Sequence, residues 1–171
     1  MCHLMLDLET LGKSAGCAIA SIGACRFDLD GVHEKFSFVI DIATTPLSIN
    51  PETLAWWFKQ DDAAIKATFG TPTGPHMRAL GDFANFYRDM KAEHIWAHGA
   101  SFDIPILEAA YLFEHIIPPW SYRQVRDTRT MFNLTGESVS TSVGVYHSSV
   151  DDAVTQAEAV IRAYKKLNLP L

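Results

Sequence analysis

Short runs of apolar residues, typical of strands, occupy the first third of the chain at residues 3–8, 18–28 and 36–40. The second run contains Gly23, and residues 28–31 (Asp-Leu-Asp-Gly) between the second and third runs are typical of a hairpin turn. These features predict an antiparallel meander of three strands at the start of the domain.

Helical spacing of apolar residues begins after residue 50. Asn50 is a favourable N-cap and Pro51 suits the first position of a helix. Leu54, Trp57 and Phe58 then fall on one helical face, and we expect Trp57 and Phe58 to pack in the core.

The remaining elements alternate between helices and strands. The order predicts one α/β domain over residues 1–171, with helices flanking a mixed sheet of about five strands, an antiparallel meander followed by parallel strands. The breaker-rich residues 70–75 predict a loop, and the long loop 136–149 is expected to be a functional lid that carries His147. Further helices are predicted at 61–69, 77–90, 104–115, 128–134 and 150–167, and short strands at 94–97 and 122–125.

Composition excludes several classes of protein. The chain is 48% hydrophobic and 20% charged, as in globular domains, and no apolar run reaches the length of a membrane span. Its start lacks the basic region of a signal peptide, and three cysteines form neither a disulfide framework nor a zinc pattern. We therefore expect a cytoplasmic protein that does not associate with membranes.

The charge balance is acidic. With 14 basic and 20 acidic residues the net charge is −6, which argues against a protein that holds nucleic acid by phosphate contacts alone. It is compatible with a nuclease, because bound divalent ions invert the local charge of an acidic site.

Three acidic residues follow predicted strands. Asp7 and Glu9 are two positions apart on a strand, so both side chains point to one face and repel each other unless cations or protons intervene. The alternative is a solvent-facing strand end. Asp103 follows the strand at 94–97, and its alternative role is to cap the next helix.

The last helix begins with a further acid. Asp151 and Asp152 lie in sequences that resemble capping boxes, which explains both acids but leaves His147 unexplained. All these acids lie at ends of elements that can converge. Hard oxygen ligands select Mg²⁺ or Mn²⁺, and two such ions ~3.5–4 Å apart are typical of phosphodiester hydrolysis. A histidine on a loop is suited to act as general base.

Three motifs together resemble the DEDD superfamily of 3′–5′ exonucleases. Residues 7–10 (Asp-Leu-Glu-Thr) resemble the first motif, residues 102–103 (Phe-Asp) the second, and residues 147–153 (His-Ser-Ser-Val-Asp-Asp-Ala) the third in its histidine form. The tyrosine form needs a tyrosine four residues before the aspartate, where Ser148 precedes Asp152. The resemblance is therefore to the DEDDh subtype, with Asp152 as the ligand.

Nearly the whole chain is similar to a compact group of phage and mycobacterial exonucleases described as 3′–5′ exoribonuclease-like. The resemblance implies an RNase H-like fold and removal of nucleoside 5′-monophosphates from 3′ ends of single-stranded RNA or DNA. The matching segments are residues 7–12, 19–24, 54–57, 99–103 and 126–130.

The resemblance also implies roles for the acids and the histidine. Asp7, Glu9 and Asp152 would hold the first of two Mg²⁺ or Mn²⁺ ions, and Asp7 would also touch the second. Asp103 would act directly or through water, and His147 would be the general base.

Further residues are expected near the substrate. Thr10 and Leu11 would lie against the terminal nucleotide, and Phe102 would border the site. Gly99 departs from the family pattern, which often has asparagine there, and His98 stands where close relatives often have asparagine; His98 either contacts substrate or packs.

Arginines and a tryptophan complete the substrate-binding candidates. Arg123, Arg126 and Arg129 recur at three-residue spacing and form either a phosphate-binding patch, with Arg126 and Arg129 favoured, or a solvated face paired with acids such as Asp127. Trp56 is a candidate for stacking on a base, or for the interface of a homodimer.

Two other functions remain open from the sequence. The same fold could serve a non-catalytic nucleic-acid-binding or assembly protein, or a two-metal phosphoesterase of short oligonucleotides. Retention of all four acids and the histidine favours the exonuclease. No side chain indicates a preference between RNA and DNA.

Overall fold

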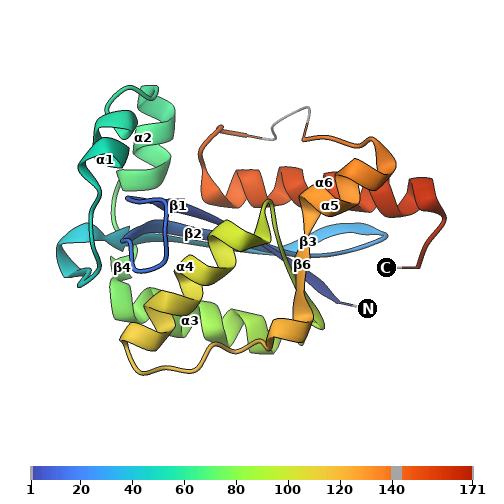
Figure 1. Cartoon of the computed structure of the whole chain (residues 1–171), viewed down its shortest axis with the longest axis horizontal. Coiled ribbons are helices and arrows are strands. Elements are labelled where there is room, and N and C mark those ends of the chain that lie inside the picture. Colours follow the sequence, from blue (N-terminus) through green and yellow to red (C-terminus); the bar gives the residue numbers. More distant parts are fainter. Residues whose placement is uncertain (1, 140–143, 171) are drawn as a thin grey trace.

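A mixed sheet of six strands forms the centre of the computed structural model, which describes residues 2–139 and 144–170 (Figure 1). The spatial order is β4-β3-β2-β1-β5-β6, with β1, β2 and β3 as an antiparallel meander and β5 and β6 parallel to β1. The predicted meander and α/β class are confirmed. The strands are β1 His3–Thr10, β2 Ile19–Asp28, β3 Gly31–Asp41, β4 Gly74–Pro75, β5 His94–Ala97 and β6 Val125–Asp127.

The sixth strand was not expected from the sequence. Residues 70–75 were predicted to form only a loop, but Gly74–Pro75 pairs in parallel with the end of β3, at Ile40 and Asp41. A proline can sit at the edge of a sheet, where its missing amide hydrogen removes no ladder bond.

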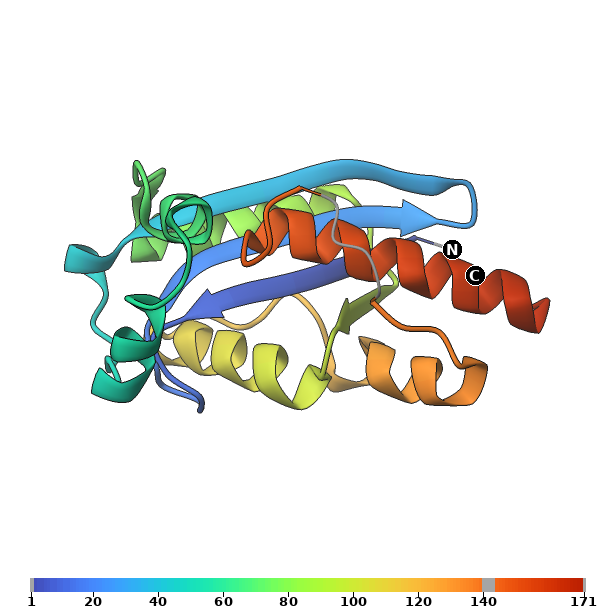
Figure 2. The same cartoon turned by 90° about the horizontal axis from the view of Figure 1, so that it is seen from above.

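Helices cover both faces of the sheet. Figure 1 and Figure 2 show α6 crossing one face with α5 beside it, α3 and α4 on the opposite face, and α1 and α2 together at one end. Two short 3₁₀ turns, Ile42–Thr44 and Tyr122–Gln124, complete the elements. The helices are α1 Pro51–Trp57, α2 Asp62–Phe69, α3 His76–Asp89, α4 Ala100–Phe113, α5 Thr128–Thr135 and α6 Ser149–Leu167.

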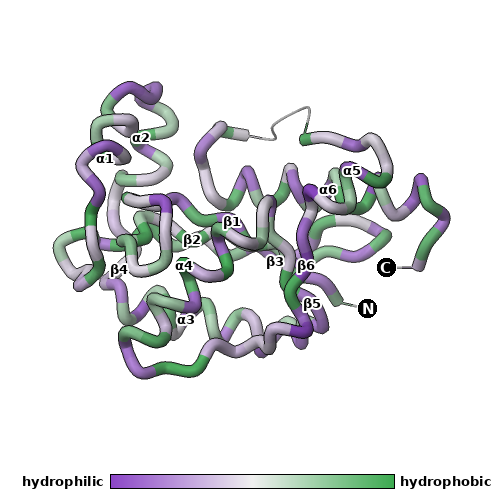
Figure 3. The backbone as a smooth tube through the Cα atoms, viewed as in Figure 1, coloured by the Kyte–Doolittle hydropathy of each residue, from purple (hydrophilic) through white to green (hydrophobic). Residues whose placement is uncertain are grey.

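Strand β1 divides two hydrophobic clusters. Leu4, Leu6 and Leu8 belong to the cluster built with α3 and α4, whereas Met5 belongs to the cluster built with α5 and α6. Because side chains alternate along a strand, the odd-numbered positions face α6. In Figure 3 hydrophobic and hydrophilic bands alternate along the strands and helices, and both kinds occur in the outer turns.

Gly23 explains how closely α6 approaches the sheet. A Cβ atom at Gly23 would lie 2.0 Å from the main-chain carbonyl carbon of Ser149, so only glycine allows this contact. Ser21, two residues earlier on β2, donates a side-chain hydrogen bond of 3.0 Å to Ser149. These contacts fix the first turn of α6, which carries Asp152, against the middle of the sheet.

The aromatic residues of α1 are distributed differently from the prediction. Trp57 is buried, with 2% of its surface exposed, as expected, but Phe58 is 76% exposed and the prediction that it packs in the core is wrong. The helix ends at Trp57 and Phe58 is its C-cap, so the chain leaves the helical path before Phe58 can reach the core. Trp56 is 43% exposed.

Among residues 2–139 and 144–170, no helix combines the length and the apolar character needed to cross a bilayer.

Candidate functional site

The four predicted carboxylates line one cavity of about 370 Å³ at the end of β1. Asp7 and Glu9 come from β1, Asp103 from the first turn of α4 and Asp152 from the first turn of α6. His147 lines the same cavity from the loop before α6. Segments separated by most of the chain therefore bring all five candidates together.

Asp103 is held against the backbone of β1. Helix α4 begins at Ala100, after Gly99 with a φ of 92°, which is four residues earlier than the sequence predicted. Asp103 thus lies inside the first turn, and its Oδ1 accepts a 3.1 Å hydrogen bond from the main-chain N–H of Leu8, between Asp7 and Glu9. The alternative in which Asp103 caps the helix is wrong.

The two neighbouring acids of α6 have different partners. Asp152 Oδ2 accepts a 3.0 Å hydrogen bond from the main-chain N–H of His147, and Asp152 lines the cavity. Asp151 Oδ2 accepts one of 2.9 Å from Val145 N–H instead. Ser148 is the N-cap of α6 but makes no capping side-chain bond, so the capping-box interpretation of these acids is wrong.

Glu9, His147 and Asp152 form the tightest group in the cavity. Each offers a possible ligand atom, and these atoms lie within 4.8 Å of one another. His147 Nδ1 lies 3.8 Å from Glu9 Oε1. Glu9 and Asp152 therefore lie close enough to share a cation, and the imidazole of His147 lies beside them.

Burial and the crowding of negative charge shift the pKa values of these acids. Removal from water, followed by the charges of Asp103, Glu9 and Asp152, raises the pKa of Asp7 well above its usual range. Burial raises the pKa of Asp103 to about 7 and that of Asp152 to about 6. The nearby carboxylate of Glu9 raises the pKa of His147.

The protein itself does little to balance this charge. No lysine or arginine in the described part of the chain forms an ion pair with any of the four acids. Unbalanced carboxylate oxygens converging on one cavity are the donor set that Mg²⁺ and Mn²⁺ prefer, so the residues present fit these ions.

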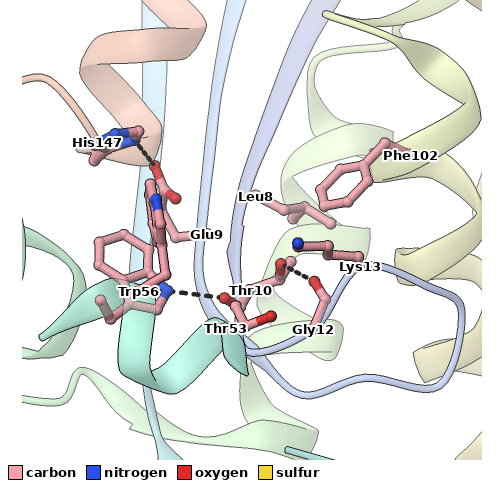
Figure 4. A pocket seen from close by; sticks show the side chains of 10 residues that line it. Leu8, Glu9, Thr10, Gly12, Lys13, Thr53, Trp56, Phe102 and His147 are labelled. Atoms are coloured by element: carbon pink, nitrogen blue, oxygen red, sulfur yellow. Dashed lines mark hydrogen bonds and ion pairs between the residues drawn. The ribbon is translucent and has the colours of Figure 1, made fainter. Parts of the chain in front are cut away.

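A second cavity of about 390 Å³ adjoins the acids and shares Leu8, Glu9, Phe102 and His147 with the first. Figure 4 shows Phe102 on one side of it and Trp56 and His147 on the other. Phe102 and Trp56 are both partly exposed, at 37% and 43% of their surface. Trp57, Thr53, Thr10, Gly12 and Lys13 complete the lining.

Two residues expected at the terminal nucleotide lie in different surroundings. Thr10 lines the second cavity, its hydroxyl donates to Gly12 O at 2.7 Å, and its carbonyl accepts from the indole of Trp57 at 2.9 Å (Figure 4). Leu11 is 1% exposed, belongs to the hydrophobic core and lines neither cavity.

The predicted arginines are also separated. Arg129 lines a cavity of about 370 Å³ together with His98, and its guanidinium carbon would lie 3.1 Å from a Cβ at Gly99. Arg126 instead lines a cavity with Tyr164 near the other end of α6, and its Nη1 donates to the carbonyls of Arg123 and Val125. The structure brings only Arg129 to the acidic end of the sheet.

His98 has partners on both sides. Its Nδ1 lies 2.8 Å from the hydroxyl of the buried Thr128, and its ring centroid lies 5.9 Å from that of Phe132. Burial, followed by the charge of Arg129, lowers the pKa of His98. His98 therefore packs against neighbouring side chains, and it also lines both the acidic cavity and the cavity of Arg129.

Several lining residues were not identified from the sequence. Gln156 donates a 2.7 Å hydrogen bond to Asp7, and its position four residues after Asp152, on the same helical face, was an available signal. The ring of Tyr146 is tilted against that of His147, with centroids 4.0 Å apart and an angle of 45° between the planes. Of the predicted lid 136–149, residues 140–143 lie outside the described residues.

Comparison with known proteins gives a family match over most of the chain. The model of the family described as 3′-5′ exoribonuclease Rv2179c-like domain matches residues 2–163. The comparison with curated proteins found no match.

Solved structures share the fold at low sequence identity, and the predicted RNase H-like architecture is confirmed. The nuclease domain of 3′hExo, a DEDDh family member bound to rAMP, has a TM-score of 0.61 and 10% identity, over 96% of this chain and 92% of that domain. Product-bound exonuclease I has a TM-score of 0.64 and 13% identity, over 98% of this chain but 43% of the enzyme. Exonuclease X with 5′-overhanging duplex DNA has a TM-score of 0.56 and 17% identity, over 97% and 93%.

Proposed function

The chain belongs to the family of 3′–5′ exoribonuclease Rv2179c-like domains and is a 3′–5′ exonuclease; from this premise we propose that it depends on divalent metal and releases nucleoside 5′-monophosphates from single-stranded RNA or DNA. The observation that carries the proposal is the convergence of Asp7, Glu9, Asp103 and Asp152 on one cavity that also contains His147.

The acids would have separate parts in holding two Mg²⁺ or Mn²⁺ ions. Glu9 and Asp152, whose possible ligand atoms lie close together, would hold the first ion with Asp7, and Asp7 would also serve the second. Asp103 would act directly or through water. Bound ions would supply the positive charge that stabilises the attacking and leaving oxygens.

His147 is the proposed general base. Its ring lies beside Glu9 and lines both cavities, so it can reach a water molecule placed between the acids and the terminal phosphodiester. A positioned imidazole that accepts this proton contributes typically 10²–10⁴-fold to such a reaction.

The second cavity would take the terminal nucleotide. Phe102 and Trp56 stand on opposite sides of it, and their rings would enclose the base without reading its hydrogen-bonding edge (Figure 4). Thr10, which lines this cavity, would lie near the sugar, and Arg129 with His98 in the adjoining cavity would meet the preceding phosphate. The rAMP bound to 3′hExo and the DNA bound to exonuclease X are ligands of the corresponding chemical class.

The test uses matched RNA and DNA oligonucleotides labelled at the 5′ end, incubated with Mg²⁺, Mn²⁺ or a chelator. We expect a ladder of labelled products that shortens from the 3′ end only when metal is present. Asp7→Ala should abolish it, because Asp7 serves both ions, whereas the exposed Asp89→Asn is the control. Wild-type turnover by Asp7→Ala would refute the mechanism.

The same assay separates the other functions. Degradation of a dinucleotide but not of a longer oligonucleotide would indicate a phosphoesterase of short substrates, and binding without degradation would indicate a non-catalytic protein. Homodimer formation and a cytoplasmic location stay predictions.

A further inference from the structure

Thr68, on α2, makes a contact with the histidine loop that the sequence did not suggest. It is fully buried, with 0% of its surface exposed, and its hydroxyl donates a 2.9 Å hydrogen bond to the main-chain carbonyl of His147, 79 residues further along the chain. We propose that Thr68 is a positioning residue that holds the general base in place; this rests on the proposed role of His147.

His147 needs such support because of its backbone. Its φ is 62°, in the left-handed region that is unfavourable for residues with a Cβ atom. A residue persists in this conformation only when its surroundings hold it there, and such residues cluster at functional sites.

Both main-chain groups of His147 are hydrogen-bonded to side chains: its N–H donates to Asp152 and its carbonyl accepts from Thr68. Its ring lies against the aromatic rings of Trp56, Trp57 and Tyr146. Asp152 is itself a proposed metal ligand and Trp56 a proposed wall for the base. Of the two main-chain hydrogen bonds, the one from the hydroxyl of Thr68 engages neither metal nor nucleotide.

The position of Thr68 makes a purely structural role a poor explanation. Threonine is a weaker helix former than alanine, and a buried hydroxyl is unfavourable without a partner. A helical threonine commonly bonds back to a carbonyl one turn earlier, as Thr135 does to Met131 O at 2.9 Å. The hydroxyl of Thr68 is bonded to the loop instead.

The contact also joins two functions in one part of the molecule. Helix α1 supplies Trp56 to the nucleotide cavity, and the adjoining α2 holds His147 through Thr68. The α1–α2 pair therefore both walls the nucleotide cavity and positions the base.

The test compares Thr68→Val, which keeps the shape and removes the hydroxyl, with Thr68→Ser, which keeps the hydroxyl. At saturating Mn²⁺ we expect Thr68→Val to lower kcat roughly three- to tenfold, the effect of one neutral hydrogen bond. KM and the Mn²⁺ dissociation constant measured by calorimetry should not change, and Thr68→Ser should behave as wild type. Thr135→Val, a matched buried helical threonine, is the control.

A second readout does not depend on activity. In the metal-free protein, Thr68→Val should accelerate amide hydrogen exchange at His147, because the loop loses an anchor. Thr68→Ala is the second variant, since it removes the hydroxyl without adding a methyl group, and it should give the same result. Unchanged exchange in a folded variant overturns the proposal.

Kinetic outcomes are equally decisive. Wild-type kcat in Thr68→Val, equal impairment of Thr68→Ser, or a loss explained by weaker Mn²⁺ binding each overturns the positioning role. His147→Ala separates this from the proposed function: if it is fully active, the general base is wrong. If His147→Ala is inactive and Thr68→Val is not impaired, only the positioning role fails.

Discussion

The side-chain amide of Gln156 donates a 2.7 Å hydrogen bond to the carboxylate of Asp7, joining α6 to β1 across 149 residues of sequence. The amide oxygen of Gln156 is buried and has no hydrogen-bond partner among the described residues. An unsatisfied buried acceptor costs about 1–3 kcal/mol. This hydrogen bond lowers the pKa of Asp7, whereas burial and the neighbouring acids raise it and prevail. The hydrogen bond to Asp7 is therefore the polar contact that the Gln156 side chain makes at the acidic cavity.

Gln156→Leu should therefore weaken metal binding. Without the amide hydrogen, Asp7 loses its orientation and holds its proton more tightly, and loss of a partner of a metal ligand typically costs 10–100-fold in affinity. Mn²⁺ titration by calorimetry measures the effect. Glu158→Gln, on the same helix and outside the cavity, should bind Mn²⁺ as wild type. An unchanged dissociation constant in Gln156→Leu would show that the amide only fills space.

The stability of the metal-free protein should fall as pH rises. Burial raises the pKa of Asp103 to about 7 and that of Asp152 to about 6, from the ordinary value of 3.8. At pH values between the ordinary pKa and the raised pKa of each group, the folded protein holds a proton that the unfolded chain has released. Increasing pH therefore favours unfolding until both groups are ionised. Each 1 kcal/mol corresponds to roughly 2–4 °C in Tm for a domain of this size.

Thermal unfolding in a chelator, compared at about pH 5 and about pH 8, measures this pH dependence. Asp103→Asn should flatten it, because the amide does not titrate. Added Mg²⁺ should restore stability at the higher pH, where the ionised carboxylates can bind it. A metal-free protein that is more stable at the higher pH would contradict the assigned pKa shifts.

Removal of either aromatic wall should weaken substrate binding. Stacking of a base on an aromatic side chain contributes ~1–3 kcal/mol, so Trp56→Ala and Phe102→Ala should each raise KM by roughly fivefold or more. Steady-state kinetics on a single-stranded oligonucleotide measures the change. Phe58→Ala is the matched control, because Phe58 is more exposed than Trp56 but lies outside the cavity. Equal effects of all three variants would argue against a specific base site.

The two arginines should differ in their effect on nucleic-acid binding. Arg129→Ala should weaken binding and reduce the slope of log affinity against log salt by about 0.7, the loss of one phosphate contact on a single strand. Arg126→Ala should change neither the affinity nor the salt dependence, because Arg126 lies beside Tyr164 on another part of the surface. Fluorescence anisotropy of the catalytically inactive Asp7→Ala background, over a range of salt, distinguishes them. If Arg126→Ala weakened binding more than Arg129→Ala, Arg126 and not Arg129 would be the phosphate contact.

Local patterns sufficed for much of the fold. The antiparallel meander, the start of α1 at Pro51 and the short strand β5 were all predicted from period, caps and turn residues. The exposure of Phe58 and the strand pairing of Gly74–Pro75 were not predicted. Both depend on where segments that are distant in the sequence lie in space.

The sequence by itself determined the chemical identity of the site. The spacing of Asp7 and Glu9 placed both on one face of β1, and the five-residue interval from His147 to Asp152 selected the histidine subtype. Both are short-range relationships: the first follows from strand geometry, and the second was interpreted through the resemblance to the DEDD motifs.

The tertiary structure alone decided which residues support those groups. Gln156 hydrogen-bonds to Asp7, and Thr68 hydrogen-bonds to His147. Arg129, but not Arg126, lies at the acidic end of the sheet. These contacts depend on how α6, α2 and α5 pack against the rest of the fold. Such contacts join positions with no sequence relationship. They follow from packing across the core, which no local pattern encodes.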